Sequence, residues 1–194
     1  LSSNKKIAHI SFTGSVQTGT LIQMAAAQNI VATTLELGGK SPQIIFDDAN
    51  INKALPFLVN AGIQNAGQTC SASSRILVQH GIYKNVLRKM SAVYRKLQVG
   101  PAIQNLDLGP VISNRQIDLI SSFRNKSFDL KKSAEGKIIK NAPRNGFYVT
   151  PQLFATDNYL HPLAQEEIFG PIQLIIPFKD EAEAIKIANS TEYG

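Results

Sequence analysis

The sequence lacks tryptophan and contains a single cysteine, Cys70, among its 194 residues. One cysteine cannot form an intramolecular disulfide, which excludes a disulfide framework and favours a reducing, cytosol-like compartment. No stretch approaches the roughly 18 consecutive apolar residues of a membrane span, and the first residues show no basic segment leading into an apolar one. We therefore expect a cytoplasmic protein without a membrane anchor.

The two ends of the sequence lack the features of a complete chain. It begins at Leu1 without an initiator methionine, and it ends on Tyr193-Gly194 just after a helical pattern. We therefore expect a part of a longer protein, and a missing targeting signal then proves little.

The sequence has little acidic charge, with 14 Asp and Glu against 20 Lys and Arg, and a net charge of +6. Such an excess raises the question of a nucleic-acid partner. Lys84, Arg88 and Lys89 crowd one expected helix, but that helix also has an apolar stripe, which makes the basic residues its solvated face. Without any nucleic-acid-binding motif, we expect no such partner.

Clusters of metal-binding residues are also missing. His9, His80 and His161 are far apart and match neither a Cys/His spacing nor a His-Glu-x-x-His arrangement. We interpret all three as structural or surface residues and expect no metal.

What is present is a regular alternation of strand and helix patterns. Apolar runs bounded by glycine or proline alternate with segments of helical periodicity, which predicts an α/β fold with a mostly parallel sheet flanked by helices. The polar stretch 131–145 is expected to be a surface connection that contains a short strand at 137–139. The expected strands are 7–12, 30–37, 43–46, 75–79, 152–155 and 173–177, and the expected helices are 51–65, 82–99, 114–126 and 181–189.

Cys70 lies in the polar stretch Gly67-Gln68-Thr69-Cys70-Ser71, with Arg75 close behind. A free cysteine is usually buried filler, but its polar neighbours favour an exposed, reactive thiol. A second stretch, Leu35-Glu36-Leu37-Gly38-Gly39, places one carboxylate in an apolar strand before a glycine pair. Cys70 and Glu36 are therefore a plausible nucleophile and base.

Four segments, in order, resemble signature segments of the NAD(P)-dependent aldehyde dehydrogenases: 12–15, 35–42, 67–75 and 166–171, with a looser match at 146–154. The resemblance covers essentially the whole chain. It implies a partial aldehyde dehydrogenase-like catalytic domain, with residues 1–35 as the tail of the coenzyme-binding domain. Residues 36–194 would then be the catalytic domain, truncated at its C-terminal end.

The resemblance implies oxidation of an aldehyde to a carboxylic acid with NAD or NADP. Cys70 would attack the aldehyde, giving a thiohemiacetal and then a thioester, and Glu36 would activate the water that hydrolyses it. A glutamate can be such a base near neutral pH if burial raises its pKa. The presence of Glu36 also favours hydrolysis over transfer to coenzyme A.

The same resemblance assigns residues to the coenzyme. Glu167 matches the glutamate that binds the nicotinamide ribose, and Phe169 matches the aromatic residue beside that ring, while Glu166 is expected to be solvated or salt-bridged. Ser15 matches a phosphate contact. Further residues expected near the coenzyme are Thr13, Gly14, Leu37, Gly38 and Gly39. The family's oxyanion asparagine would lie before Leu1.

Two interpretations of the chain remain open. The first is a part of a longer aldehyde dehydrogenase that forms a homo-oligomer and is inactive as this fragment alone. The alternative is an isolated, non-catalytic fold or assembly module. Rapid alkylation of Cys70 by iodoacetamide would favour the first, and slow alkylation the second.

Overall fold

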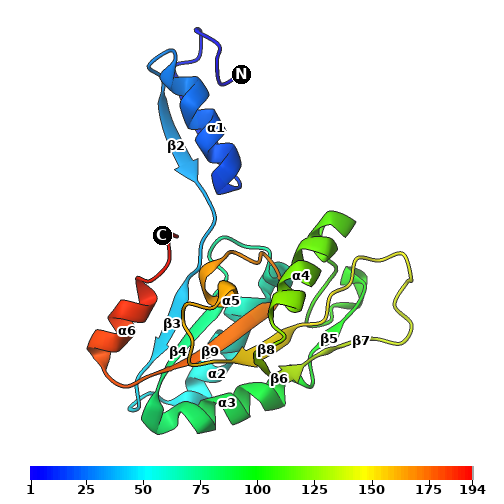
Figure 1. Cartoon of the computed structure of the whole chain (residues 1–194). Helices are drawn as coiled ribbons and strands as arrows, with labels where there is room; N and C mark the ends of the chain where they lie inside the picture. Colours follow the sequence, from blue (N-terminus) through cyan, green and yellow to red (C-terminus); the bar gives the residue numbers. More distant parts are fainter. Residues whose placement is uncertain (194) are drawn as a thin grey trace. The chain divides into compact units, whose positions relative to one another are not determined.

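The structure, a computed structural model, describes residues 1–193 and divides into two compact units, Leu1–Gly39 and the remainder from Lys40 onward (Figure 1). The first unit is a strand, a helix and a strand: β1 (His9–Thr13), α1 (Val16–Ala27) and β2 (Ala32–Glu36). The two strands are parallel, with Thr13 opposite Glu36. The strands expected at 7–12 and 30–37 are therefore confirmed here.

The second unit is built on a five-stranded sheet with the order β3-β4-β9-β8-β6. The first four strands run parallel, and β6 pairs antiparallel with β8 at the edge. This confirms the mostly parallel sheet. The strands are β3 (Pro42–Ile45), β4 (Arg75–Gln79), β9 (Ile172–Phe178), β8 (Gln152–Ala155) and β6 (Lys131–Glu135), and β5 (Gln98–Val99) and β7 (Lys137–Ile138) form a separate pair.

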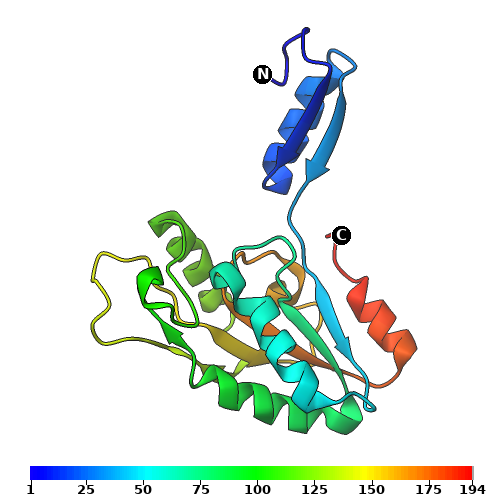
Figure 2. The same cartoon turned by 180° about the vertical axis from the view of Figure 1, so that it is seen from behind.

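Helices cover both faces of this sheet, as in other three-layer α/β folds. The helices α2 (Ile51–Ile63) and α3 (His80–Tyr94) lie against the face seen in Figure 2. The helices α4 (Asn114–Lys126) and α5 (Pro162–Gln165) lie on the face toward the viewer in Figure 1. The last helix, α6 (Glu181–Ala188), contacts β9.

The core of the second unit is centred on β4 and β9, whose residues are almost all buried. Central parallel strands covered on both faces read as continuous apolar runs, as these do. Gln173 is the polar exception in β9 and is completely buried. Its amide is satisfied, because Nε2 donates to the carbonyls of Leu58 and Ser73 and Oε1 accepts from the Tyr94 hydroxyl.

Two sequence-based predictions are wrong. The expected surface connection contains the expected short strand, which is β7, but also the unexpected β6, whose lysines are exposed while Ala134 is buried. An edge strand of this kind carries polar residues and gives no clear apolar pattern. The expected helix 82–99 ends at Tyr94, because Gln98 and Val99 pair with the distant β7 instead.

None of the helices within residues 1–193 combines the length and the apolar character needed to cross a bilayer.

The packing of Gln173 predicts opposite effects for two helical glycines. A Cβ at Gly62 in α2 would lie 2.1 Å from the Gln173 side chain, whereas at Gly81 in α3 the nearest atom would be 3.6 Å away. We expect Gly62→Ala to lower the free energy of unfolding by about 1–3 kcal/mol, because Gln173 is held by three hydrogen bonds and cannot move aside.

Gly81→Ala is the matched control and should leave stability unchanged or raise it by up to about 1 kcal/mol, since alanine is the better helix former. Urea unfolding of both variants followed by circular dichroism makes the comparison. Equal stability of the two variants would contradict the packing described for Gln173.

Candidate active site

The loop that carries Cys70 follows α2 through an unusual backbone turn. Asn65, Ala66 and Gly67 have φ values of 49°, 54° and 76°, so three successive residues are left-handed. This conformation costs free energy at non-glycine residues and persists only where the surroundings hold it. Here the Asn65 and Gln68 side chains each donate to the other's backbone carbonyl. The turn leaves Cys70 exposed, as its polar neighbours predicted.

Gly67 brings this loop into contact with another of the predicted segments. A Cβ at Gly67 would lie 2.2 Å from the carbonyl carbon of Gly170, so only glycine allows the two backbones to approach this closely. Gly170 belongs to the stretch Glu166 to Pro171. The structure therefore brings together the cysteine loop and the Glu166–Pro171 loop, which are about a hundred residues apart in sequence.

The Glu166–Pro171 loop is itself fixed in a strained conformation. Phe169 has a φ of 52°, and its carbonyl accepts a hydrogen bond of 2.8 Å from Gln116 Nε2. Its ring remains 37% exposed, while the neighbouring Ile168 is buried. Glu166 forms an exposed ion pair with Lys126 at 3.0 Å, in agreement with the sequence-based interpretation. The loop thus exposes part of Phe169, while the Gln116 side chain holds its backbone in place.

One short segment links both loops. Ile112 N–H donates to Gln68 Oε1 at 2.9 Å, and Gln116, four residues later, holds the Phe169 carbonyl. The Ser-x-x-Gln spacing of Ser113 and Gln116 is typical of a helix cap, so the sequence predicts only that role for Gln116. The Ser113 hydroxyl does accept from Gln116 N–H, but the Gln116 side chain does not return to Ser113. The contact of Gln116 with Phe169 could not be recognised from the sequence, because the two residues are 53 positions apart.

Arg75 serves the framework of the site. Its side chain is 2% exposed and donates to three carbonyls, those of Lys40, Ile187 and Ala188, at 2.8–2.9 Å. Burial lowers the pKa of this guanidinium to about 10. Because Ile187 and Ala188 end α6, the cation donates to carbonyls at a helix C-terminus, where positive charge is favourable. Arg75 thus fixes the start of β4 behind the cysteine loop.

Lys40 is a second buried cation that the sequence did not single out. It is 1% exposed, and its amine has no hydrogen-bond partner among the described residues. Burial, assisted by the charge of Arg75, lowers the pKa of Lys40 to about 7, although Glu167 and Glu166 oppose the shift. A buried lysine of this kind is often functional, since it changes charge near neutral pH.

The first unit collects the remaining predicted residues at the carboxyl ends of its two strands. Gly14 N–H donates to the Glu36 carbonyl at 3.0 Å, which joins the turns that follow β1 and β2. Ser15 caps α1 by accepting from Thr18 N–H. Ligands of parallel α/β sheets usually bind at this end of the strands. Thr13 and Leu37 lie beside these residues, and Gly38 follows directly.

Glu36 is exposed, because the residues of β2 alternate between exposed and half-buried positions. The partial burial that its leucine neighbours suggested is therefore not found within this unit. Leu37 is half-buried and packs against Gly19 of α1, where an added Cβ would lie 2.6 Å from the leucine. Cys70, Glu167 and Phe169 belong to the other unit.

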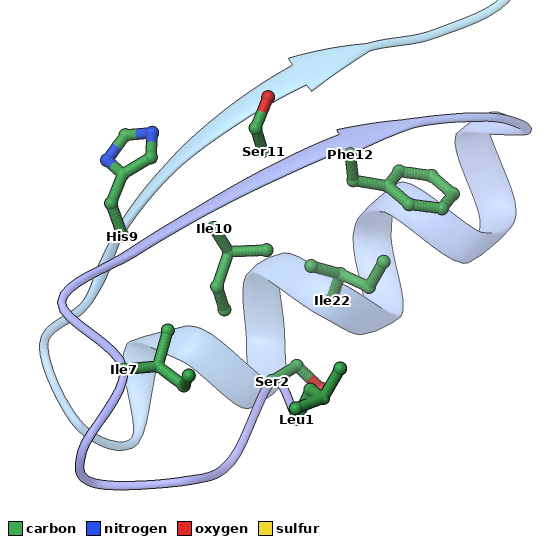
Figure 3. Close-up of a pocket in the computed structure, with 8 residues that line it drawn as sticks. All are labelled: Leu1, Ser2, Ile7, His9, Ile10, Ser11, Phe12 and Ile22. Atoms are coloured by element: carbon green, nitrogen blue, oxygen red, sulfur yellow. The ribbon is translucent and has the colours of Figure 1, made fainter.

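The first unit also has an apolar hollow of about 450 Å³. Figure 3 shows Ile10 of β1 next to Ile22 of α1, whereas His9 and Ser11 point to the other side of the strand. None of the predicted site residues lines this hollow. Across residues 1–193, no three or more His, Cys, Asp or Glu side chains are grouped so that they could hold a metal ion.

Comparison with known proteins bears on what these two groups of residues do. A model of the aldehyde dehydrogenase family matches residues 1–194. The chain belongs to this family. An aldehyde dehydrogenase of Emericella nidulans is 44% identical over 200 residues, which cover 100% of this chain and 39% of that protein.

Solved aldehyde dehydrogenases have the same fold along the whole chain. The betaine aldehyde dehydrogenase of Staphylococcus aureus, solved with NAD+, is 36% identical with a TM-score of 0.93 and is 39% covered. Aldehyde dehydrogenase C of Pseudomonas syringae, solved as a mutant with NAD+ and octanal, is 32% identical with a TM-score of 0.93 and is 40% covered. The chain spans about two-fifths of the length of the aldehyde dehydrogenases that it matches.

The buried amine of Lys40 predicts a specific pH dependence of stability. The unfolded chain holds this proton with the ordinary pKa of 10.5, whereas the folded protein releases it at about pH 7. Between these two pKa values the unfolded chain binds more protons than the folded protein, so the free energy of unfolding should rise by about 1.4 kcal/mol per pH unit. The destabilisation caused by the buried charge is fully present below pH 7.

Lys40→Met should be more stable than the wild type near neutral pH, and the difference should shrink as pH rises. Lys53→Met, which removes an exposed lysine of α2, is the control and should run parallel to the wild type. Urea unfolding of the three proteins from pH 6 to about 10 tests this. A constant offset between Lys40→Met and the wild type would refute the titration of Lys40.

Proposed function

We propose that this chain is part of a longer aldehyde dehydrogenase that oxidises an aldehyde to a carboxylic acid with NAD or NADP. The family membership supports this proposal, as does the coverage of only about two-fifths of each relative. Residues 1–35 would end the coenzyme-binding domain, and residues 36–194 would form most of the catalytic domain. The division into compact units at Gly39, close to that boundary, agrees with this assignment.

The observation that carries the proposal is the exposed thiol of Cys70 on a loop held from several sides. Gly67 against Gly170 and Gln68 against Ile112 fix the loop, while the thiol stays accessible. Among residues 1–193 the Cys70 N–H has no hydrogen-bond acceptor. It is therefore available to stabilise the oxyanion that forms when sulfur attacks a carbonyl carbon.

The residues of the two units fit the parts of a dinucleotide. The capped N-terminus of α1, a helix of 12 residues, offers backbone N–H groups of the kind that bind phosphate. Glu167 is half-buried and can accept hydrogen bonds from ribose hydroxyls, and the Phe169 ring is exposed enough to lie against a flat heterocycle. When bound, the coenzyme supplies the acceptor for the hydride that the substrate carbon loses.

The chain's own residues carry the remaining steps. The Cys70 thiolate adds to the aldehyde carbon and forms the thiohemiacetal, and loss of hydride from that carbon leaves a thioester. Glu36 removes a proton from water, which adds to the thioester carbon. The carbon–sulfur bond then breaks, the carboxylic acid leaves, and the thiolate is restored. Aldehyde, water and oxidised coenzyme thus become acid, reduced coenzyme and a proton.

Assembly into a homo-oligomer is a further part of the proposal. Phe57, Ile103 and Phe128 are large, exposed apolar side chains, which an interface between subunits would bury if they lie on it. The alternative, a non-catalytic module, predicts that the Cys70 thiol reacts with iodoacetamide no faster than a free cysteine.

We predict that Cys70→Ala abolishes aldehyde-dependent reduction of NAD(P) in the full-length protein and leaves coenzyme binding intact. The reason is that no other cysteine in this chain can form the thioester. Ser71→Ala, which changes the exposed neighbour, should keep at least half of the activity. The assay is absorbance at 340 nm; turnover by Cys70→Ala would exclude Cys70 as the nucleophile. The 194-residue chain alone should show no turnover.

Glu36→Gln should affect deacylation more than hydride transfer. The full-length variant should give a burst of NAD(P)H of about one equivalent per site, followed by a steady state at least about a hundredfold slower, as acyl-enzyme accumulates. Glu166→Gln, which removes a carboxylate from an exposed ion pair, is the control. Rapid-quench or stopped-flow kinetics separate the phases, and a normal steady-state rate would eliminate Glu36 as the base.

A further inference from the structure

The loop with Glu167 and Phe169 begins at a helix that is capped by a histidine. We propose that His161 is a positioning residue for the coenzyme site, because its neutral ring fixes the short helix from which Glu167 emerges. This inference rests on the proposed function, in which Glu167 binds the coenzyme ribose. It assigns a role to a buried histidine that takes no part in the chemistry itself.

The hydrogen bonds of His161 define the state of its ring. The side chain is 5% exposed. Its Nδ1 accepts from Leu163 N–H at 3.0 Å, and its Nε2 lies 3.2 Å from Asp129 Oδ1. A carboxylate can only accept, so the ring hydrogen lies on Nε2 and Nδ1 carries the free lone pair. Both contacts require this one tautomer of the neutral imidazole.

The helix that His161 caps is too short to persist without such contacts. α5 contains four residues, Pro162–Gln165, which form a single turn. The His161 carbonyl accepts from Ala164 and Gln165 N–H, so both the ring and the backbone of His161 serve this turn. The buried side chains of Leu163 and Ala164 pack the turn against the core.

Glu167 follows this turn directly. Glu166 N–H donates to the Pro162 carbonyl and closes the turn, and Glu167 is the next residue. On the other side, Gln116 holds the Phe169 carbonyl. The Glu167 backbone therefore lies between two fixed points, the capped helix α5 and the Gln116 contact. Loss of the cap frees the first of them and widens the range of positions open to the carboxylate.

Substitutions at position 161 can separate capping from simple filling of space. Asparagine is a good N-cap residue and keeps an acceptor for Leu163 N–H, whereas leucine fills the space without an acceptor. We expect His161→Leu to raise the Kd of NAD+ in the full-length enzyme by about fivefold to tenfold, the effect of losing one cap. His161→Asn should stay within about twofold of the wild type.

Three further variants complete the experiment. Glu167→Gln measures what the carboxylate itself contributes, and His80→Leu, at an exposed histidine of α3, is the control for removing an imidazole. Asp129→Ala removes the Nε2 partner from a half-exposed position and should raise the Kd by about twofold to threefold, which provides a test if His161→Leu does not fold. The kcat at saturating NAD+ and the alkylation rate of Cys70 should stay near wild type in all but Glu167→Gln.

Hydrogen exchange supplies a readout that does not depend on catalysis. In the 194-residue chain, the amides of residues 163–166 should exchange at least fivefold faster in His161→Leu than in His161→Asn. Faster exchange together with a raised Kd supports the inference. A wild-type Kd in both His161→Leu and Asp129→Ala, while Glu167→Gln raises it, overturns the inference alone. If Glu167→Gln also binds NAD+ normally, the proposed coenzyme role of Glu167 fails and the inference fails with it.

Discussion

The close approach of Gly67 to Gly170 is the contact on which the site in the second unit depends. It requires a residue without a side chain at Gly67 and a left-handed backbone before it, and it fixes the cysteine loop against the loop of Phe169. Any Cβ at this point would separate the two backbones. The exposure of the thiol and the presentation of the aromatic ring are thus two results of one steric constraint.

The buried positive charge of Arg75 is compensated by hydrogen bonds to carbonyl groups and not by an ion pair. The guanidinium uses carbonyl oxygens from the start of β3 and the end of α6, so one side chain joins segments that are about 150 residues apart in sequence. Lys40 has no such compensation and shifts its pKa instead. The two cations show the two ways in which a buried positive charge is accommodated, by hydrogen bonds to carbonyls and by release of the proton.

Local patterns predicted those features that local contacts determine. The polar neighbours of Cys70 predicted an exposed thiol, and the helices predicted at 114–126 and 181–189 begin where α4 and α6 begin. Features that depend on distant partners were not predictable in this way. The strand β6 exists because β8 lies beside it, and Gln116 and His161 gain their roles from segments far along the chain. Glu36 is exposed within the first unit, although its apolar neighbours suggested partial burial.

The pairing of β4 with β9 also sets the order of events during synthesis. Arg75 pairs with Leu174, about a hundred residues later, and Gly170 lies just before β9. When the cysteine leaves the ribosome, the backbone against which its loop packs has not yet been made. At elongation rates of about 5–20 residues per second, the nascent chain carries an unsupported thiol for roughly 5–20 seconds. The packed form of the Cys70 loop is therefore completed late, and the growing chain passes through a stage in which nothing yet holds this loop in place.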